Sequence, residues 1–154
     1  MTITFCGHSS FCEEKNYKNA LIEYLIKITA NEKNVDILLG GYGQFDAFAL
    51  SCSKQLKAYH KNCKLIFVTP YITESYLKNS IAILKDEYDE ILYPELEKVP
   101  MRFAISKRNR WMIKQADIVI AYITHDWGGA YQSYSYAKKL GKTVFNLNNS
   151  FSDT

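Results

Sequence analysis

The sequence lacks the features that mark membrane, secreted and zinc-binding proteins. No apolar stretch approaches the roughly twenty residues that a membrane-spanning helix needs, and the start has neither the basic region nor the apolar core of a signal peptide. The four cysteines show no Cys-x-x-Cys spacing, and there is no His-x-x-x-His or Cys-His cluster. We therefore expect a cytoplasmic protein with no metal, no cofactor and no membrane partner.

A dominant charge of one sign is also missing. The chain has 19 Lys and Arg residues against 16 Asp and Glu residues, a formal net charge of +3. The basic residues are scattered along the sequence, and Lys107, Arg108 and Arg110 form the tightest group. Because a nucleic-acid surface needs basic residues gathered on one face, this distribution argues against a nucleic-acid partner.

What the chain does have is a regular alternation of strand and helix patterns over its 154 residues. Short β-prone runs predict strands, and apolar residues at i, i+3, i+4 and i+7 predict helices. We expect strands at 3–6, 35–39, 65–69, 90–93, 118–123 and 143–147, and helices at 17–28, 45–59, 73–86, 100–116 and 129–140. The series predicts one domain over residues 1–154, a Rossmann-like three-layer α/β sandwich with a mostly parallel sheet.

Glycine is scarce, with seven residues, but apart from Gly141 each one follows a predicted strand. Ligands of an open parallel sheet bind outside the carboxyl ends of its strands. Glycine lets the backbone approach a phosphate there, and a helix that begins at the same place presents unpaired N–H groups. The glycine turns therefore predict a single ligand crevice.

The segment 108–130 gives the most specific signal for a site. A basic helix leads to Asp117, an apolar strand and the turn Trp127-Gly128-Gly129-Ala130. Helical spacing puts Arg108 on the more apolar side of its helix, where a charge needs a partner. We expect Arg108 to bind phosphate, and Asn109 to hold the loop or the ligand. The alternative for Arg108 is a charged side chain on the solvent-exposed side of the helix.

Aromatic residues flank these turns. Trp127, Tyr42 and Tyr131 lie next to glycines. Their rings could stack on a nucleotide base or pack on their own loops, and the sequence leaves both roles open.

Three separated segments carry a family resemblance: Phe5-Cys6-Gly7-His8-Ser9-Ser10, the helix Arg108 to Met112 with Gln115-Ala116-Asp117, and Gly128-Gly129-Ala130. They resemble the SLOG superfamily, which includes the Lonely Guy phosphoribohydrolases and the core of DprA-like proteins. A bacterial and phage branch of unknown function, the YpsA/YoqJ-like family, is more similar still, through Gly43 to Asp46, Arg102 to Met112 and Trp127 to Ala130. The resemblance implies a Rossmann-like nucleotide-binding domain that can form a homodimer.

One departure from the Lonely Guy pattern bears on catalysis. If Gly128 and Gly129 are the paired glycines of that family's phosphate loop, Ser135 stands where the family has its catalytic glutamate. Cleavage of an N-ribosyl bond passes through an oxocarbenium-like state that a carboxylate stabilises and a serine does not. Asp46 and Asp126 are the candidate carboxylates, and the alternative role of Asp46 is to complement a helix dipole.

We interpret the chain as a sensor or sequestering protein for a nucleotide or nucleotide-derived small molecule, such as a nucleoside phosphate, NAD or an ADP-ribose-like compound. The alternatives are an N-ribosyl hydrolase or transferase and a DprA-like single-strand nucleic-acid binder. The expected ligand-binding residues are Gly7, His8, Ser9, Gly41, Gly43, Asp46, Arg108, Asn109, Trp127, Gly128, Gly129 and Ala130.

Overall fold

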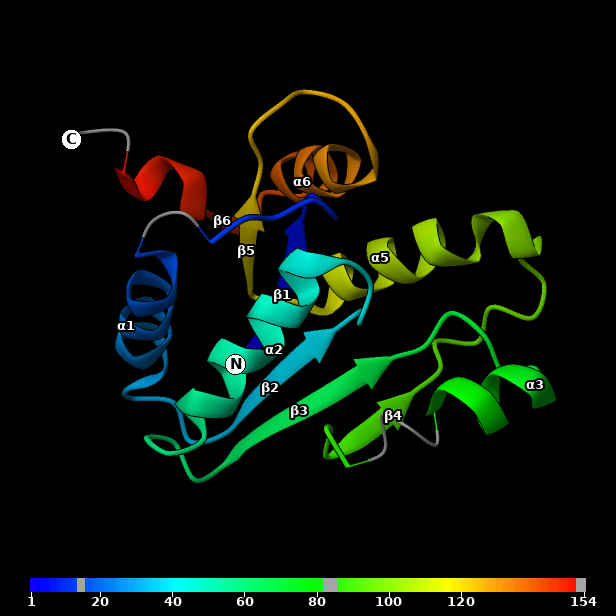
Figure 1. The fold of residues 1–154 in the computed structure, drawn as a ribbon, viewed down its shortest axis with the longest axis horizontal. Coiled ribbons are helices and arrows are strands. Elements are labelled where there is room, and N and C mark those ends of the chain that lie inside the picture. The colour runs from blue at the N-terminus through cyan, green and yellow to red at the C-terminus, as the bar shows by residue number, and fades with distance from the viewer. Residues whose placement is uncertain (14–15, 82–85, 152–154) are drawn as a thin grey trace.

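A computed structural model describes residues 1–13, 16–81 and 86–151 (Figure 1). In these residues, six strands form one sheet in the order β4-β3-β2-β1-β5-β6, and every neighbouring pair is parallel. The strands are β1 (Thr2–Gly7), β2 (Val35–Leu39), β3 (Cys63–Val68), β4 (Glu90–Leu92), β5 (Ile118–Tyr122) and β6 (Thr143–Asn146). The predicted α/β class is confirmed.

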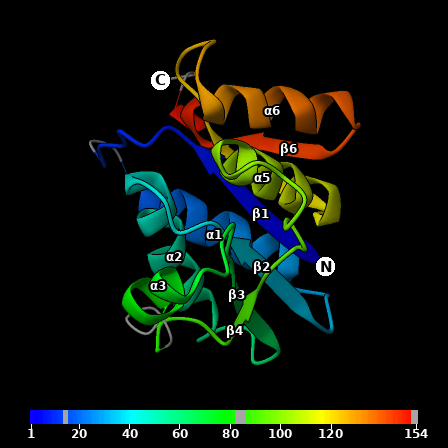
Figure 2. The same cartoon turned by 90° about the vertical axis from the view of Figure 1, so that its right-hand side faces the viewer.

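Helices cover both faces of the sheet (Figure 2). They are α1 (Tyr17–Thr29), α2 (Gln44–Leu56), α3 (Glu74–Tyr76), the π-helical turn η1 (Leu77–Ile81), the 3-10 turn η2 (Met101–Phe103), α5 (Ala104–Gln115), α6 (Gly129–Lys139) and the 3-10 turn η3 (Leu147–Phe151). α1 and α2 pack on one face, and α5 and α6 pack on the other. None of the helices in the described ranges is both long and apolar enough to cross a bilayer.

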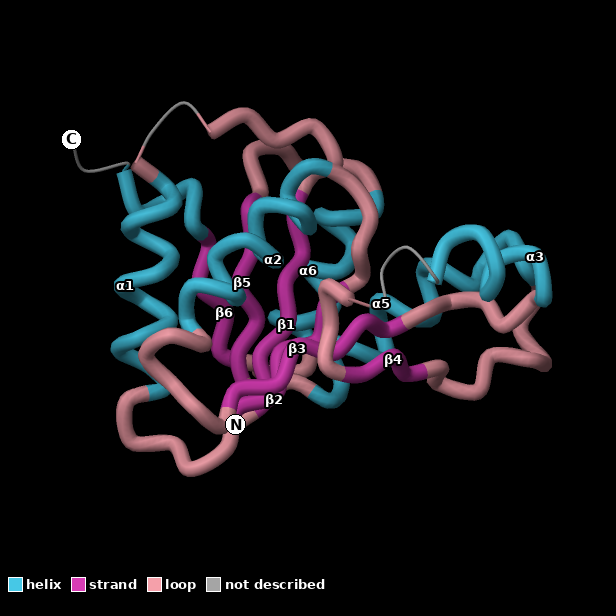
Figure 3. Tube along the Cα trace, turned by 60° about the horizontal axis from the view of Figure 1, so that its bottom comes forward, coloured by secondary structure: helices cyan, strands magenta, loops and turns pink. Residues whose placement is uncertain are grey.

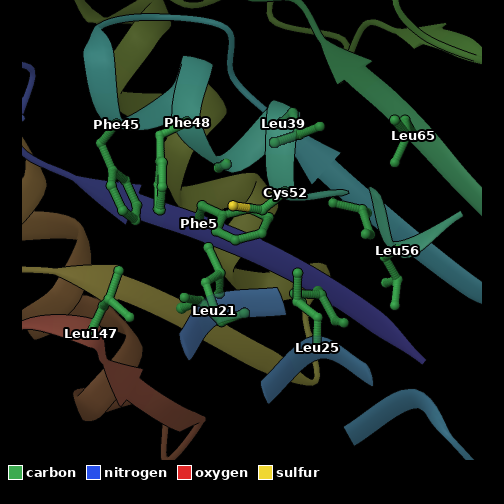
Figure 4. Close-up of a cluster of buried hydrophobic side chains, with 14 of the residues drawn as sticks. Phe5, Leu21, Leu25, Leu39, Phe45, Phe48, Cys52, Leu56, Leu65 and Leu147 are labelled. Atoms are coloured by element: carbon green, nitrogen blue, oxygen red, sulfur yellow. The ribbon is translucent and has the colours of Figure 1, made fainter. Parts of the chain in front are cut away.

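The two faces of the sheet follow from the alternation of side chains along each strand. Phe5, Leu39 and Leu65 point toward α1 and α2, where they join buried residues such as Leu21 and Phe45 (Figure 4). Their strand neighbours Cys6, Leu38 and Ile66 belong to the clusters under α5 and α6. Both faces of the central strands are thus buried, as a parallel sheet requires.

The order of the strands sets the place of the site. From β1 the chain proceeds through α1 to β2 on one side, and from β5 it proceeds through α6 to β6 on the other side. β1 and β5 are neighbours in the sheet, so the two connections diverge from adjacent strands. In open α/β sheets such a switch point leaves a crevice outside the carboxyl ends of the two strands.

The third and fourth predicted helices differ from the sequence-based prediction. The Thr73 side chain caps the third helix as expected, accepting a hydrogen bond from the Tyr76 N–H at 3.4 Å, but regular α-helix ends at Tyr76 and a π-helical turn follows. Residues 82–85 of that prediction lie outside the described residues. The helix that starts near Pro100 begins with the 3-10 turn η2, and α5 begins only at Ala104. Figure 3 shows α3 beyond the β4 edge of the sheet, far from α1.

Candidate functional site

A cavity of about 520 Å³ lies at the switch point. Its walls come from the end of β1, from the loops after β1, β2 and β5, from the first turn of α2, and from α5 and α6. The lining residues are Phe5, Cys6, Gly7, His8, Ser9, Ser10, Tyr42, Asp46, Ile105, Arg108, Asn109, Met112, Ile113, Thr124, His125, Trp127, Gly128, Gly129, Ala130 and Ser133. A volume of this size suits a nucleotide-sized ligand, since small-molecule sites span roughly 300–1,000 Å³.

Arg108 lines this cavity and is 2% exposed. Its Nη1 donates hydrogen bonds to the carbonyl oxygens of Val68 at 2.7 Å and Gly40 at 2.9 Å, which lie at the carboxyl ends of β3 and β2. Its Nε donates to Oδ1 of Asn109 at 2.9 Å. Within the described residues Nη2 has no acceptor, so one donor group of this buried cation stays available to a ligand.

Gly40 makes this arrangement possible. A Cβ atom at position 40 would lie 3.2 Å from Cζ of Arg108 and 3.4 Å from Oδ2 of Asp46, closer to the guanidinium than a side chain normally packs. The bare backbone therefore lets the guanidinium reach the ends of two strands. Burial lowers the pKa of Arg108, and the charge of Asp46 opposes that shift.

Asp46 lines the cavity beside this cation. Its Oδ2 accepts a hydrogen bond from the Tyr42 N–H at 2.8 Å. Burial raises the pKa of Asp46 to about 6, although the hydrogen bond from Tyr42 and the charge of Arg108 both oppose the shift. A carboxyl group with this pKa can give up or take a proton near neutral pH, which is what a general acid or base needs.

His8 joins the two strands that flank the switch point. The Thr124 N–H, just after β5, donates a hydrogen bond to Nε2 of His8, just after β1, at 3.0 Å. Because Nε2 accepts, the proton of the neutral ring belongs on Nδ1. Burial lowers the pKa of His8, and the nearby His125 lowers it further.

Three rings stack at the mouth of the cavity. The ring of His125 lies 3.6 Å from that of His8 and 3.9 Å from that of Trp127, with interplanar angles of 13° and 22°. Trp127 is 67% exposed, and Tyr42, which also lines the cavity, is 68% exposed. Each exposed ring offers a flat apolar surface on which a base can stack.

The turn that begins α6 has the open backbone expected of an anion site. Gly128 caps the helix with φ 91°, a conformation that favours glycine, and no side chain of the described residues caps the first turn. A Cβ atom at Gly128 or Gly129 would meet no described atom within 4 Å. This uncapped turn lies in the wall of the cavity, where its N–H groups can attract an anion.

Most of the expected ligand-binding residues meet in this one cavity. Gly41 and Gly43 are the exceptions, since they shape the loop after β2 and do not line the cavity. Of the two candidate carboxylates, Asp46 lines the cavity and Asp126 does not; Ser135 lies outside it as well. Contact of these residues with a ligand stays a prediction.

The prediction missed part of the wall formed by α5 and α6. Ile105 and Met112 line the cavity from α5, and Ser133 lines it from α6. The spacing of Ile105, Arg108 and Met112 at i, i+3 and i+7 is the signal that could have identified the α5 wall, because it puts them on one side of the helix.

Cys6, in the cavity wall, is poorly suited to nucleophilic chemistry. Burial raises the pKa of Cys6 to about 12, with the charge of Asp46 as the smaller cause. The thiolate is the reactive form, and a shift in this direction suppresses it. In the described ranges, no three His, Cys, Asp or Glu side chains gather as a metal site would require.

Basic residues gather on the α5–α6 face. Neither helix contains Asp or Glu, and together they carry Lys107, Arg108, Arg110, Lys114, Lys138 and Lys139. Of these, Arg108 is buried, and the other five are exposed.

The sequence matches no protein-family model and no curated protein. Solved structures of similar fold include DNA processing protein A from Helicobacter pylori, whose structure describes its single-stranded DNA binding mode. The TM-score is 0.62 and the sequence identity is 20%. The match covers 99% of this chain and 72% of that chain. DNA processing protein A (DprA) from Streptococcus pneumoniae has a TM-score of 0.62 and 18% identity over 94% of this chain and 49% of that chain. At this identity the likeness concerns the fold. The expectation that argued against a nucleic-acid partner no longer stands, because the Helicobacter pylori protein of similar fold binds single-stranded DNA.

We predict that Arg108→Ala destabilises the fold. The substitution leaves the carbonyl groups of Gly40 and Val68 buried without a donor, which should lower the free energy of unfolding by about 2–5 kcal/mol. Urea denaturation measures this loss. Lys107→Ala, an exposed change on the same helix, is the control and should change stability by less than about 0.5 kcal/mol. Equal effects of the two substitutions would contradict the structural role of Arg108.

We also predict that acid weakens the contact between His8 and Thr124. The pKa of His8 in the folded protein lies below the ordinary 6.5, so the unfolded chain binds more protons and stability falls as the pH drops below 6.5. The raised pKa of Asp46 has the opposite effect, adding stability as the pH falls through about 6. The difference in unfolding free energy between the wild type and His8→Gln, measured from pH 7.5 to 5, isolates the histidine. A difference that does not shrink with falling pH would refute this account.

Proposed function

We propose that the chain is a SLOG-type domain that binds a nucleotide in the switch-point cavity, with the phosphate held between Arg108 and the first turn of α6. The observation that carries the proposal is the buried Arg108 guanidinium. Its Nη1 and Nε are used by the protein, and among the described residues its Nη2 has no acceptor. A planar guanidinium donor beside uncapped backbone N–H groups is well suited to a phosphate.

The rest of the cavity suits the other parts of a nucleotide. Trp127 and Tyr42 are exposed at its rim, and a base can stack on either ring. Asp46 and the hydroxyl groups of Ser9 and Ser10 lie in the wall and can form hydrogen bonds with a ribose. Each type of group that a nucleotide presents therefore has a complementary group in the cavity.

A second candidate is that the nucleotide unit belongs to a single strand of DNA. The Helicobacter pylori protein of similar fold binds single-stranded DNA, and its likeness covers 99% of this chain. The basic α5–α6 face beside the cavity supports this candidate, because phosphate contacts supply much of the affinity for a strand.

A third candidate is an N-ribosyl hydrolase or transferase, favoured by one observation. Asp46 lies in the cavity wall and has a pKa of about 6. Asp46 would supply the carboxylate that the Lonely Guy enzymes have as a glutamate at the position of Ser135. Asp126 is the weaker choice, because it does not line the cavity.

The first test of nucleotide binding is Gly129→Val. Position 129 has open space around it, so we expect the variant to fold with an unchanged melting temperature, while the branched side chain blocks the approach of a phosphate to α6. Calorimetric titration with the four ribonucleoside monophosphates, ADP-ribose and a ten-residue thymidine oligonucleotide should show binding to the wild type and a loss of at least about tenfold in the variant. Ser135→Val adds the same side chain to the same helix outside the cavity and should bind as the wild type does. If none of these compounds binds the wild type, the proposal fails.

For turnover, we predict that the protein releases base from nucleoside monophosphates or NAD only slowly, because no glutamate occupies position 135. Chromatography of the reaction mixtures measures the release. Asp46→Asn and the control Asp126→Asn are assayed in parallel. Rapid release that is lost in Asp46→Asn and kept in Asp126→Asn would favour the enzyme instead.

A further inference from the structure

A second cavity adjoins the first in the groove between α5 and α6. It has a volume of about 230 Å³ and shares four of its lining residues, Ile105, Asn109, Gly129 and Ser133, with the switch-point cavity. The two cavities are therefore neighbours along one groove. The first turn of α6 forms a wall of both.

The second cavity is lined by two further arginines. Arg102 and Arg110 contribute to its wall, together with the neutral side chains of Ser106 and Gln132. No carboxylate among the described residues lines it, and neither arginine forms an ion pair there. By contrast, Lys57 and Lys64 elsewhere on the surface are each paired with a carboxylate. The positive charge in the groove is thus uncompensated.

Aromatic rings contact both guanidinium groups. Cζ of Arg110 lies 5.2 Å from the centroid of the Tyr136 ring, on α6 across the groove. Cζ of Arg102 lies 4.8 Å from the centroid of the Phe103 ring. Such cation–π contacts orient a guanidinium without using its N–H groups, which stay free to bind an anion.

We propose that the second cavity binds a second phosphate group of the same ligand, so that the ligand consists of linked nucleotides and not of a single monophosphate. The inference rests on the proposed binding of a nucleotide in the first cavity. Arg108 lines the first cavity, and Arg102 and Arg110 line the second. Each cavity therefore has its own guanidinium donors for a phosphate. The shared α6 turn lies between them.

The test compares ligands of one, two and ten thymidine nucleotides, each with a 5′ phosphate, by calorimetry on the wild type and on the double variant Arg102→Gln with Arg110→Gln. We expect the double variant to bind the dinucleotide and the ten-residue strand about 10-fold more weakly, and the mononucleotide within about twofold of the wild type. Glutamine keeps hydrogen-bonding groups at both positions, so the comparison isolates the charge.

Salt dependence gives a second readout. If Arg102 and Arg110 each neutralise a phosphate of the strand, replacing them should reduce the slope of log affinity against log salt by about 0.7 for each phosphate no longer neutralised. The control double variant, Lys27→Gln with Lys33→Gln, removes the same two charges from positions outside the α5–α6 face. It should leave both the affinities and the slope unchanged.

The outcomes separate the two proposals. A wild type that binds all three ligands, with no selective loss in the double variant, would overturn the second phosphate site and leave nucleotide binding intact. A loss of equal size for the mononucleotide and the dinucleotide would also overturn it. Failure of the wild type to bind any thymidine ligand, repeated with the adenosine series, would overturn both. A dinucleotide that binds as tightly as the ten-residue strand would identify a linked dinucleotide as the ligand class.

Discussion

The burial of the Arg108 guanidinium is the constraint on which the site depends. A buried charge is costly unless hydrogen bonds compensate it, and here the carbonyl groups of Gly40 and Val68 do so. These contacts fix α5 to the carboxyl ends of β2 and β3. They also fix the direction of the guanidinium plane, so the remaining donor is rigidly oriented. A ligand that accepts a hydrogen bond from this donor avoids the entropic cost of ordering a flexible surface arginine.

The position of β1 next to β5 explains why the remaining groups converge. The loops after these two strands diverge in opposite directions, yet the hydrogen bond between Thr124 and His8 joins them at their starting points. The stack of His8, His125 and Trp127 continues this connection to the surface. The β5–α6 loop is longer than a minimal turn, and these contacts hold it against the sheet. The backbone of Gly128 and Gly129 is thereby held next to the cavity.

Local patterns predicted the fold well, because helix and strand periods reflect burial directly. The second strand, 35–39, agrees with β2 at both ends, while the third helix, at 73–86, gives way to a π-helical turn after Tyr76 that no periodicity signals. The structural contacts of Arg108 were not predictable, since its acceptors at Gly40 and Val68 are backbone carbonyls with no signature in the sequence. The combined basic charge of α5 and α6 was missed for a related reason. Lys107 and Lys138 are distant along the chain, and only the packing of α5 on α6 brings their charges onto one face.

The shared wall between the two cavities bears on the nature of the ligand. Gly129 and Ser133 line both cavities, so the start of α6 is a wall shared by the cavity of Arg108 and the cavity of Arg110. A helix N-terminus attracts an anion from either direction, because its partial charge is spread over several N–H groups. A compact monophosphate would use only one of these sides. A ligand with linked phosphates could follow the groove past the helix start and use both, and this would explain why the basic residues extend along α5 beyond the switch-point cavity.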